Sequence, residues 1–168
     1  EGMGPVATAL LPTLADGLAF SKNTITAQVM QKVGPARVAE LARAMGVRES
    51  KLEEVPSLAL GTSPVTLREM VTAYTTLAGG GRYAEPLLVT RVTDRQGRVL
   101  AAFEPSPAQE ALSAEAATLL VDVLRDAVSR GTGAAVRTSW GITADVAGKT
   151  GTTQDTADGW FILMHPQL

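Results

Sequence analysis

The chain has 168 residues, of which 45% are apolar and 19% charged, enough for one folded domain with a real core. Its net charge is −2 with no basic block, so nucleic acid is not expected as a partner. It has no cysteine, which excludes disulfides and cysteine–zinc sites, and no run of about 20 apolar residues that would cross a membrane.

The single histidine is His165, which stands beside Pro166. A Ser-His-Asp triad or a multi-histidine metal site would have to be built around this one residue. We expect it to be a surface residue instead. The sequence therefore predicts neither a metal site nor a cofactor.

The first part of the chain is expected to be mainly helical. Short helices are expected at 7–11 and 14–20, where apolar residues lie between prolines. Apolar residues at helical spacing predict a longer helix over 23–33. A second helix should begin at Pro35, because proline suits a first turn, and end at Gly46.

The middle of the chain combines a loop with another helix. Residues 47–65 read as a loop, within which 58–61 is expected to be a short extended piece. Thr66 and Glu69 have the spacing of a capping box, so a helix should begin there. The three glycines at 79–81 should end it.

A β-hairpin and a long helix are expected next. Two β-rich runs, 86–93 and 98–103, are separated by the turn-like residues 94–97. Ser113 is then expected to cap a helix that runs to about Ser129.

Two antiparallel strands are expected at the end of the chain, over 143–153 and 159–164, joined by a turn at 154–157. The order of elements is helices, hairpin, helix, hairpin. That order predicts an α+β fold in which helices flank an antiparallel sheet.

The second-last predicted strand carries a chemically distinctive run, Lys149-Thr150-Gly151-Thr152-Thr153. In a strand, Thr150 and Thr152 point to the same face and Lys149 to the other. An ammonium and hydroxyl donors can hold a carboxylate, and an exposed strand can pair with an extended substrate. The N–H of Thr152 is positioned to meet a developing oxyanion. The same residues also suit an ordinary hairpin strand rich in glycine and threonine.

A second short pattern, Ser21-Lys22-Asn23, matches Ser-x-Asn and lies at the start of a predicted helix. Ser21 also suits a plain helix N-cap there. Ser-x-Asn followed by Lys-Thr-Gly is the motif order of penicillin-binding enzymes, whose first motif is Ser-x-x-Lys.

With its surroundings, the pair of motifs resembles the transpeptidase domain of class A penicillin-binding proteins. The likeness extends over roughly residues 17–165. The stretches that carry it are 19–24, 59–67, 74–81, 128–135 and 147–153.

The resemblance implies a role for each motif residue. Ser21 would relay a proton between nucleophile, base and leaving group, and Asn23 would bind the base lysine and the substrate amide. Lys149 would supply positive potential. The substrate-binding residues that it implies are Thr150, Gly151, Thr152 and Thr153.

The chain departs from the family pattern in small ways and in one large way. Lys22 stands where some relatives have aspartate, and Gln154 where asparagine is frequent. The large departure is the missing Ser-x-x-Lys motif. The four lysines are preceded, three positions earlier, by Ala19, Val29, Arg48 and Val146, none of which is serine.

We therefore expect an incomplete β-lactamase/transpeptidase-like domain. Residues 17–168 would be the C-terminal part of a penicillin-binding transpeptidase domain, and residues 1–16 a leader or linker. On its own this chain should be inactive, because the nucleophile of the family is absent from it.

The resemblance implies part of a serine D,D-transpeptidase that cross-links peptidoglycan and binds β-lactams through an acyl-enzyme. A β-lactamase or D,D-carboxypeptidase relative, or a non-catalytic penicillin-recognising sensor or scaffold, remains open. The implied partners are the peptidoglycan stem peptide, β-lactam antibiotics and the rest of the domain. The implied location is the extracytoplasmic face of the bacterial membrane, with the anchor outside this chain.

Overall fold

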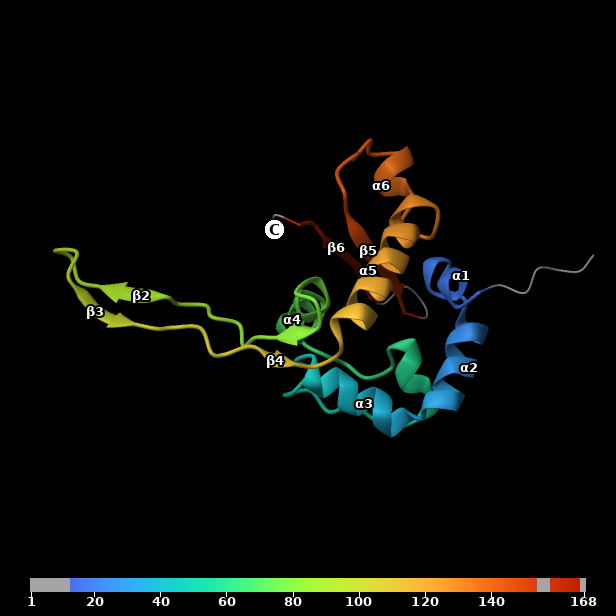
Figure 1. Ribbon diagram of the computed structural model, residues 1–168, viewed down its shortest axis with the longest axis horizontal. Coiled ribbons are helices and arrows are strands. Elements are labelled where there is room, and N and C mark those ends of the chain that lie inside the picture. The colour runs from blue at the N-terminus through green and yellow to red at the C-terminus, as the bar shows by residue number, and fades with distance from the viewer. Residues whose placement is uncertain (1–12, 154–157, 167–168) are drawn as a thin grey trace, which may run out of the picture.

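The computed structural model describes residues 13–153 and 158–166. The helix expected at 7–11 and the turn expected at 154–157 lie outside the described residues. The ribbon in Figure 1 shows a body of helices with a long hairpin extending from it.

Three helices open the described chain, as the sequence predicts. They are α1 (Leu14–Ala19), α2 (Asn23–Val33) and α3 (Pro35–Ala44). Beyond α3, Gly46 has a φ of 119°, and a Cβ there would lie 2.6 Å from Cγ2 of Thr72. Glycine is required at this position by both its backbone and its close packing against the next helix.

The piece expected to be extended at 58–61 is instead a 3₁₀-helix, η1 (Pro56–Leu60). Pro56 fixes the first φ, and the N–H of Leu58 donates to the carbonyl oxygen of Val55 at 2.9 Å. Gly61 then ends the turn in the left-handed region, with a φ of 78°. The expectation of extended structure was wrong because these local turn signals outweigh the apolar side chains between them.

Helix α4 (Leu67–Ala78) begins at the predicted capping box. The N–H of Glu69 donates to Oγ1 of Thr66 at 3.2 Å, and the N–H of Thr66 donates to the Glu69 carboxylate at 3.0 Å. The long helix α5 (Ala114–Ser129) is capped by Ser113, also as predicted, and the short helix α6 (Ala135–Thr138) follows it.

The strands form three separate two-stranded antiparallel sheets in the described part of the chain. The expected α+β class and antiparallel pairing are confirmed, and the last strand lies at 159–164 as predicted. The two strands of the hairpin and the first strand of the last pair are shorter than predicted, and that last pair begins at Ala147 rather than at residue 143. The sheets pair β1 (Arg82–Tyr83) with β4 (Gln109–Glu110), β2 (Arg91–Thr93) with β3 (Val99–Ala102), and β5 (Ala147–Thr152) with β6 (Gly159–Met164).

Helix α5 lies against β5 and holds the core of this half of the molecule (Figure 1). Leu124 and Val128 on α5 are 2% and 0% exposed, and Val146 and Ala147 at the start of β5 are also buried. Burial of one such aliphatic side chain contributes about 1.5–3 kcal/mol. A Cβ on Gly148 would come within 3.2 Å of Cγ2 of Val128, so glycine allows the helix and strand to approach closely.

The β2–β3 hairpin projects away from the helices (Figure 1). Its paired strands occupy only part of the β-rich runs at 86–93 and 98–103 that the sequence predicts. The pairing is irregular between Val92 and Thr93. Several large apolar side chains along this arm are exposed, namely Leu87, Leu88, Val89, Val92, Val99, Leu100 and Phe103.

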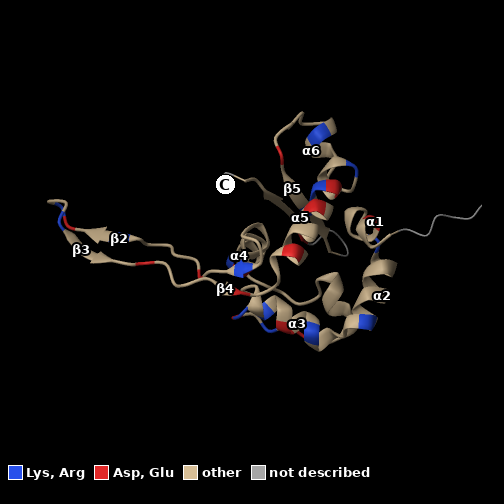
Figure 2. Ribbon diagram, viewed as in Figure 1, with Lys and Arg blue, Asp and Glu red and all other residues tan. Residues whose placement is uncertain are grey.

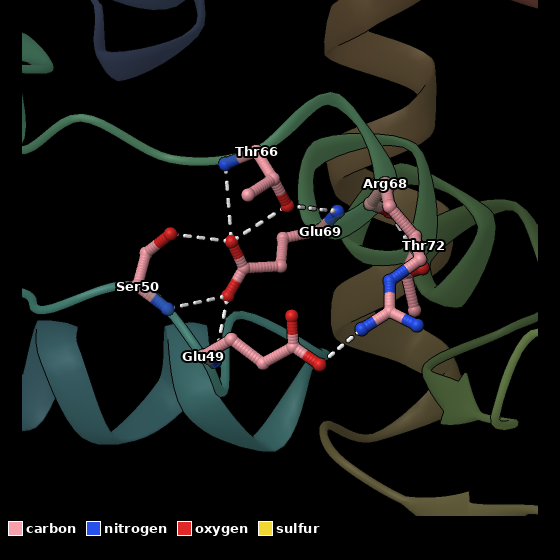
Figure 3. Close-up of polar contacts among 6 residues, drawn as sticks. All are labelled: Glu49, Ser50, Thr66, Arg68, Glu69 and Thr72. Atoms are coloured by element: carbon pink, nitrogen blue, oxygen red, sulfur yellow. Dashed lines mark hydrogen bonds and ion pairs between the residues drawn. The ribbon is translucent and has the colours of Figure 1, made fainter.

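A buried carboxylate ties the loop after α3 to the start of α4 (Figure 3). Glu69 is 2% exposed. One of its oxygens accepts from the N–H groups of Glu49 and Ser50, both at 2.8 Å. The other accepts from the hydroxyls of Ser50 and Thr66, at 2.5 and 2.8 Å. Burial alone would raise the pKa of this carboxyl, but the hydrogen bonds from Ser50 and Thr66 outweigh it and hold the pKa far below its usual range.

Charges of both signs are interspersed along the helices (Figure 2). Within 13–153 and 158–166, no helix has the length and apolar character needed to cross a bilayer, and no cluster of side chains is suited to a metal ion. His165 is half-buried, so the expectation of a surface residue is only partly met.

Candidate active site

The structure brings the two sequence motifs together, although they are 128 residues apart. The ammonium of Lys149 donates to the hydroxyl of Ser21 and to the carbonyl oxygen of Thr150, the latter at 2.8 Å. Lys149 is on β5, and Ser21 lies between α1 and α2. The strand and the interhelical turn therefore meet at a single polar contact.

The end of α1 determines how Ser21 is presented. The N–H of Ser21 donates to the carbonyl oxygen of Leu18 at 3.2 Å, and the N–H of Lys22 donates to that of Gly17 at 2.8 Å. These two bonds are those of a Schellman motif, in which the residue at the Ser21 position is left-handed and is usually glycine. Ser21 has a φ of 51°, the one positive φ among the non-glycine residues that the structure describes.

The interpretation of Ser21 as a plain N-cap was therefore wrong. The N-cap residue of α2 is Lys22, and it makes no side-chain capping bond. Instead, the hydroxyl of Ser21 accepts a hydrogen bond from the ammonium of Lys149. A serine held in a conformation that favours glycine is the kind of local strain that accompanies functional positions.

Replacing Ser21 with glycine is expected to give a more stable protein than replacing it with alanine, by about 1 kcal/mol. Both variants lose the hydroxyl, so the difference isolates the left-handed backbone. The free energy of unfolding of the two variants, measured by urea titration, checks this. An alanine variant at least as stable as the glycine variant would contradict the strain that we assign to Ser21.

Lys149 is half-buried, and its burial lowers the pKa of the ammonium below the usual value. No carboxylate lies within ion-pair distance of it in residues 13–153 and 158–166. Its visible partners are a hydroxyl and a carbonyl, neither of which carries a full negative charge. The positive charge is therefore available to an anionic ligand.

One edge of β5 is unpaired within the described part of the chain, because β5 pairs only with β6. The N–H of Thr153 points to β6, where it donates to the carbonyl oxygen of Asp158 at 3.1 Å. Because backbone groups alternate in direction along a strand, those of Thr152 and Thr150 point to the other edge. The Thr150 carbonyl contacted by Lys149 is on this edge, so the ammonium and the Thr152 N–H lie along the same free strand edge.

The remaining predicted site residues differ from one another in their hydrogen bonds and in their position in the fold. Gly151 and Thr152 are exposed on β5. Thr153 is occupied at the hairpin end, where its hydroxyl accepts from the N–H of Asp158 at 2.8 Å. Asn23 is exposed at the first position of α2, and its side chain makes no hydrogen bond to the described residues.

Thr150 has a partner that the motif reasoning missed. Its Oγ1 lies 2.6 Å from Oγ1 of Thr132, in the loop after α5. The stretch 128–135 contributed to the family resemblance, but its glycines read only as the end of a helix. The signal available in the sequence was the Gly131-Thr132-Gly133 run itself, which combines a hydroxyl with two residues suited to close backbone approach.

The loop at 130–133 also braces the end of α1. The N–H of Thr132 donates to the carbonyl oxygen of Ala19 at 3.1 Å, and a Cβ on Gly131 would lie only 2.1 Å from that oxygen. The guanidinium of Arg130 binds Asp16 at 2.9 Å and lies 5.5 Å from the centroid of the Phe20 ring. One loop thus contacts both the turn that carries Ser21 and the strand that carries Thr150.

A cleft of about 470 Å³ borders the strand. Its walls combine residues 149–152 of β5 and the following Thr153 with Trp160 and Ile162 of β6, Tyr74 of α4, and residues 58–65, which include the end of η1. Burial raises the pKa of the Tyr74 phenol above its usual value. A second groove, of about 460 Å³, is lined mainly by apolar side chains of α1, α2 and α5.

A cation, several hydroxyls and a free strand edge beside a cleft are suited to an extended ligand that ends in a carboxylate. The residues are also suited to passing a proton, since the Ser21 hydroxyl contacts an amine whose pKa is lowered. The sequence contains no Ser-x-x-Lys motif.

Comparison with known proteins gives the family. The model of the penicillin binding protein transpeptidase domain matches residues 6–167. Penicillin-binding protein 1A of Neisseria meningitidis is 32% identical over 164 residues, a match that covers 93% of this chain and 20% of that protein. The chain thus spans about a fifth of that relative's length.

Solved structures agree with this match. Penicillin-Binding Protein 1A from Haemophilus influenzae superposes with a TM-score of 0.80 at 26% identity, over 90% of this chain and 28% of that one. The PonA1 protein from Mycobacterium tuberculosis in complex with penicillin V has a TM-score of 0.72 at 28% identity, over 92% of this chain and 45% of that one. The resemblance found in the sequence is confirmed, and the chain belongs to the penicillin-binding protein transpeptidase family.

Proposed function

We propose that this chain is part of a serine D,D-transpeptidase that cross-links peptidoglycan stem peptides and is acylated by β-lactams. The observation that carries the proposal is the contact between Lys149 and Ser21 at the free edge of β5. The family match supports it, as does the complex of the related PonA1 protein with penicillin V. We call the longer protein that would contain this chain the parent protein.

In the proposed reaction, the serine of a Ser-x-x-Lys motif elsewhere in the parent protein attacks the carbonyl carbon of the substrate. Its oxygen bonds to that carbon, the carbon–nitrogen bond breaks, and the serine proton moves to the departing nitrogen. Ser21 relays this proton, and Asn23 binds the base lysine and the substrate amide. The amine of a second stem peptide then attacks the acyl carbon, the bond between that carbon and the serine oxygen breaks, and a proton from the amine returns to the serine oxygen.

The strand β5 holds the substrate in this proposal. The substrate backbone pairs with the free edge, and the N–H of Thr152 stabilises the oxyanion of the tetrahedral intermediate. The hydroxyls of Thr150 and Thr152 bind the substrate carboxylate, Gly151 leaves room for it, and Lys149 supplies the compensating charge. Thr153 supports this substrate-binding strand at its hairpin end.

The proposed substrate also sets the proposed location. Peptidoglycan is assembled outside the bacterial cytoplasm, so the site would face the periplasm or cell wall. The anchor would then belong to a part of the parent protein outside this chain, and the rest of the transpeptidase domain would be its structural partner.

Labelled penicillin tests the proposal. The parent protein is expected to be acylated stably and to release the label slowly, whereas this chain alone should stay unlabelled because it contains no Ser-x-x-Lys motif. Gel detection of the label on both proteins, followed over time, is the measurement.

Each other outcome of this experiment has a definite meaning. Fast hydrolysis of the penicillin would indicate a β-lactamase, and a parent protein without any label would indicate a sensor or scaffold. A labelled band at the mass of this chain would contradict the placement of the nucleophile outside it.

A further inference from the structure

We propose that Thr132 is a positioning residue for the carboxylate end of the substrate, acting through the hydroxyl of Thr150. This inference rests on the proposed function, because it assigns a new residue to the carboxylate-binding part of the same site. Its basis is the 2.6 Å contact between the two threonine hydroxyls.

Either hydroxyl can be the donor in this contact, and a bound carboxylate would favour the arrangement in which Thr132 donates. A threonine hydroxyl has one proton to donate and can accept two hydrogen bonds, whereas a carboxylate only accepts. When Thr132 donates to Thr150, the proton of Thr150 is left to point at the ligand. Each bond in such a series polarises the next, so the donor that meets the carboxylate becomes stronger.

Thr132 is held firmly enough to act in this way. Its N–H donates to the carbonyl oxygen of Ala19, and the N–H of Gly133 donates to that of Ala127 at 2.9 Å. Gly131 lies so close to the Ala19 carbonyl that no side chain fits between them. The loop is therefore anchored on α5 and on the last residue of α1, two positions before Ser21.

The hydroxyl pair contributes little to the stability of the fold. Thr132 is exposed and Thr150 is half-buried, so water can replace either partner. A hydrogen bond of this kind contributes about 0.5–1.5 kcal/mol at most. Removing the Thr132 hydroxyl should therefore leave folding nearly unchanged, and the effect should appear in ligand binding.

The test compares Thr132→Val with Thr132→Ser in the parent protein. Valine keeps the branched shape and removes the hydroxyl, whereas serine keeps the hydroxyl. The probes are benzylpenicillin and its methyl ester, and the measurement is the second-order rate constant of acylation of each protein by each probe, with the thermal midpoint recorded alongside.

Thr132→Val is expected to slow acylation by benzylpenicillin about 5- to 10-fold, within the range expected for the loss of one hydrogen bond between uncharged groups. The rate with the methyl ester should change less than about two-fold, since that probe has no carboxylate to bind. Thr132→Ser, which keeps the hydroxyl, should react with benzylpenicillin at the rate of the unmutated parent protein.

An equal loss with both probes, or no loss with either, would overturn the role of Thr132. These results differ from a failure of the proposed function, in which the unmutated parent protein would not be acylated at all. That outcome would remove the proposed function and, with it, the inference.

Discussion

Replacing Lys149 with alanine in the parent protein is expected to slow acylation by penicillin about 10- to 100-fold. In the described part of the chain, Lys149 is the cation at the free edge of β5, and no carboxylate neutralises it. Removing the charged partner of a bound carboxylate typically costs about 1.5–3 kcal/mol, which corresponds to this range of rates. The measurement is the second-order rate constant of acylation.

Lys32→Ala provides the matched control, because Lys32 is an exposed lysine in the last turn of α2. It should leave the acylation rate unchanged within about two-fold, the scatter of a surface substitution. Unchanged acylation in the Lys149 variant, or an equal loss in both variants, would refute the role that we assign to Lys149.

Replacing Glu69 with glutamine is expected to lower the free energy of unfolding by about 2–4 kcal/mol at pH 7. The change keeps the shape but replaces one carboxylate oxygen by an NH₂ group. That NH₂ group would face hydrogen-bond donors from Ser50 and either Glu49 or Thr66 (Figure 3). The buried donors would then lack an acceptor. Urea unfolding of the two proteins gives the difference.

The stability contributed by Glu69 should also depend on pH. Its pKa is lower in the folded protein than in the unfolded chain, where a glutamate has a pKa of about 4.3. The contribution is therefore fully present above about pH 5 and is lost as the pH falls below the unfolded pKa toward the folded one. The difference between the original protein and Glu69→Gln should shrink steadily as the pH falls below about 5.

The control is Glu49→Gln, an identical chemical change at a residue whose backbone N–H, but not its side chain, contacts Glu69. Glu49 is exposed, and among residues 13–153 and 158–166 its side chain pairs only with Arg68 at the surface. Such pairs contribute about 0–1 kcal/mol. If both variants lost the same stability, or if the Glu69 difference did not respond to acid, the structural role of the buried carboxylate would be refuted.

The helices were predictable because their signals are local. The capping box of Thr66 and Glu69 specifies the start of α4 through atoms three residues apart, and Ser113 does the same for α5. Pro35 begins α3 and Gly46 follows its end with a positive φ. Each of these signals is read in a few neighbouring residues, without knowledge of the rest of the fold.

The motifs pointed to candidate site residues, but they did not specify how those residues are arranged. Ser21 suited an N-cap equally well, and its left-handed conformation arises in a Schellman motif at the end of α1, which a serine does not signal because glycine is the usual residue there. The contact of Thr132 with Thr150 joins two segments 18 residues apart, and no local pattern specifies it. The strands predicted at 86–93 and 98–103 were longer than the observed β2 and β3 for a similar reason. The length of a strand depends on its pairing partner rather than on the propensity of its residues.

The 128-residue separation of Lys149 and Ser21 has a consequence for biosynthesis. A ribosome synthesises α1 and the Ser21 turn before β5, and the lysine that must meet Ser21 is added 128 positions later. Closing so long a loop carries an entropic cost that local helix formation does not offset. The nascent chain therefore contains helices α1 to α5 before it contains β5, and the ability to bind a ligand is acquired only after the Ser21 turn and β5 have both been synthesised and brought together.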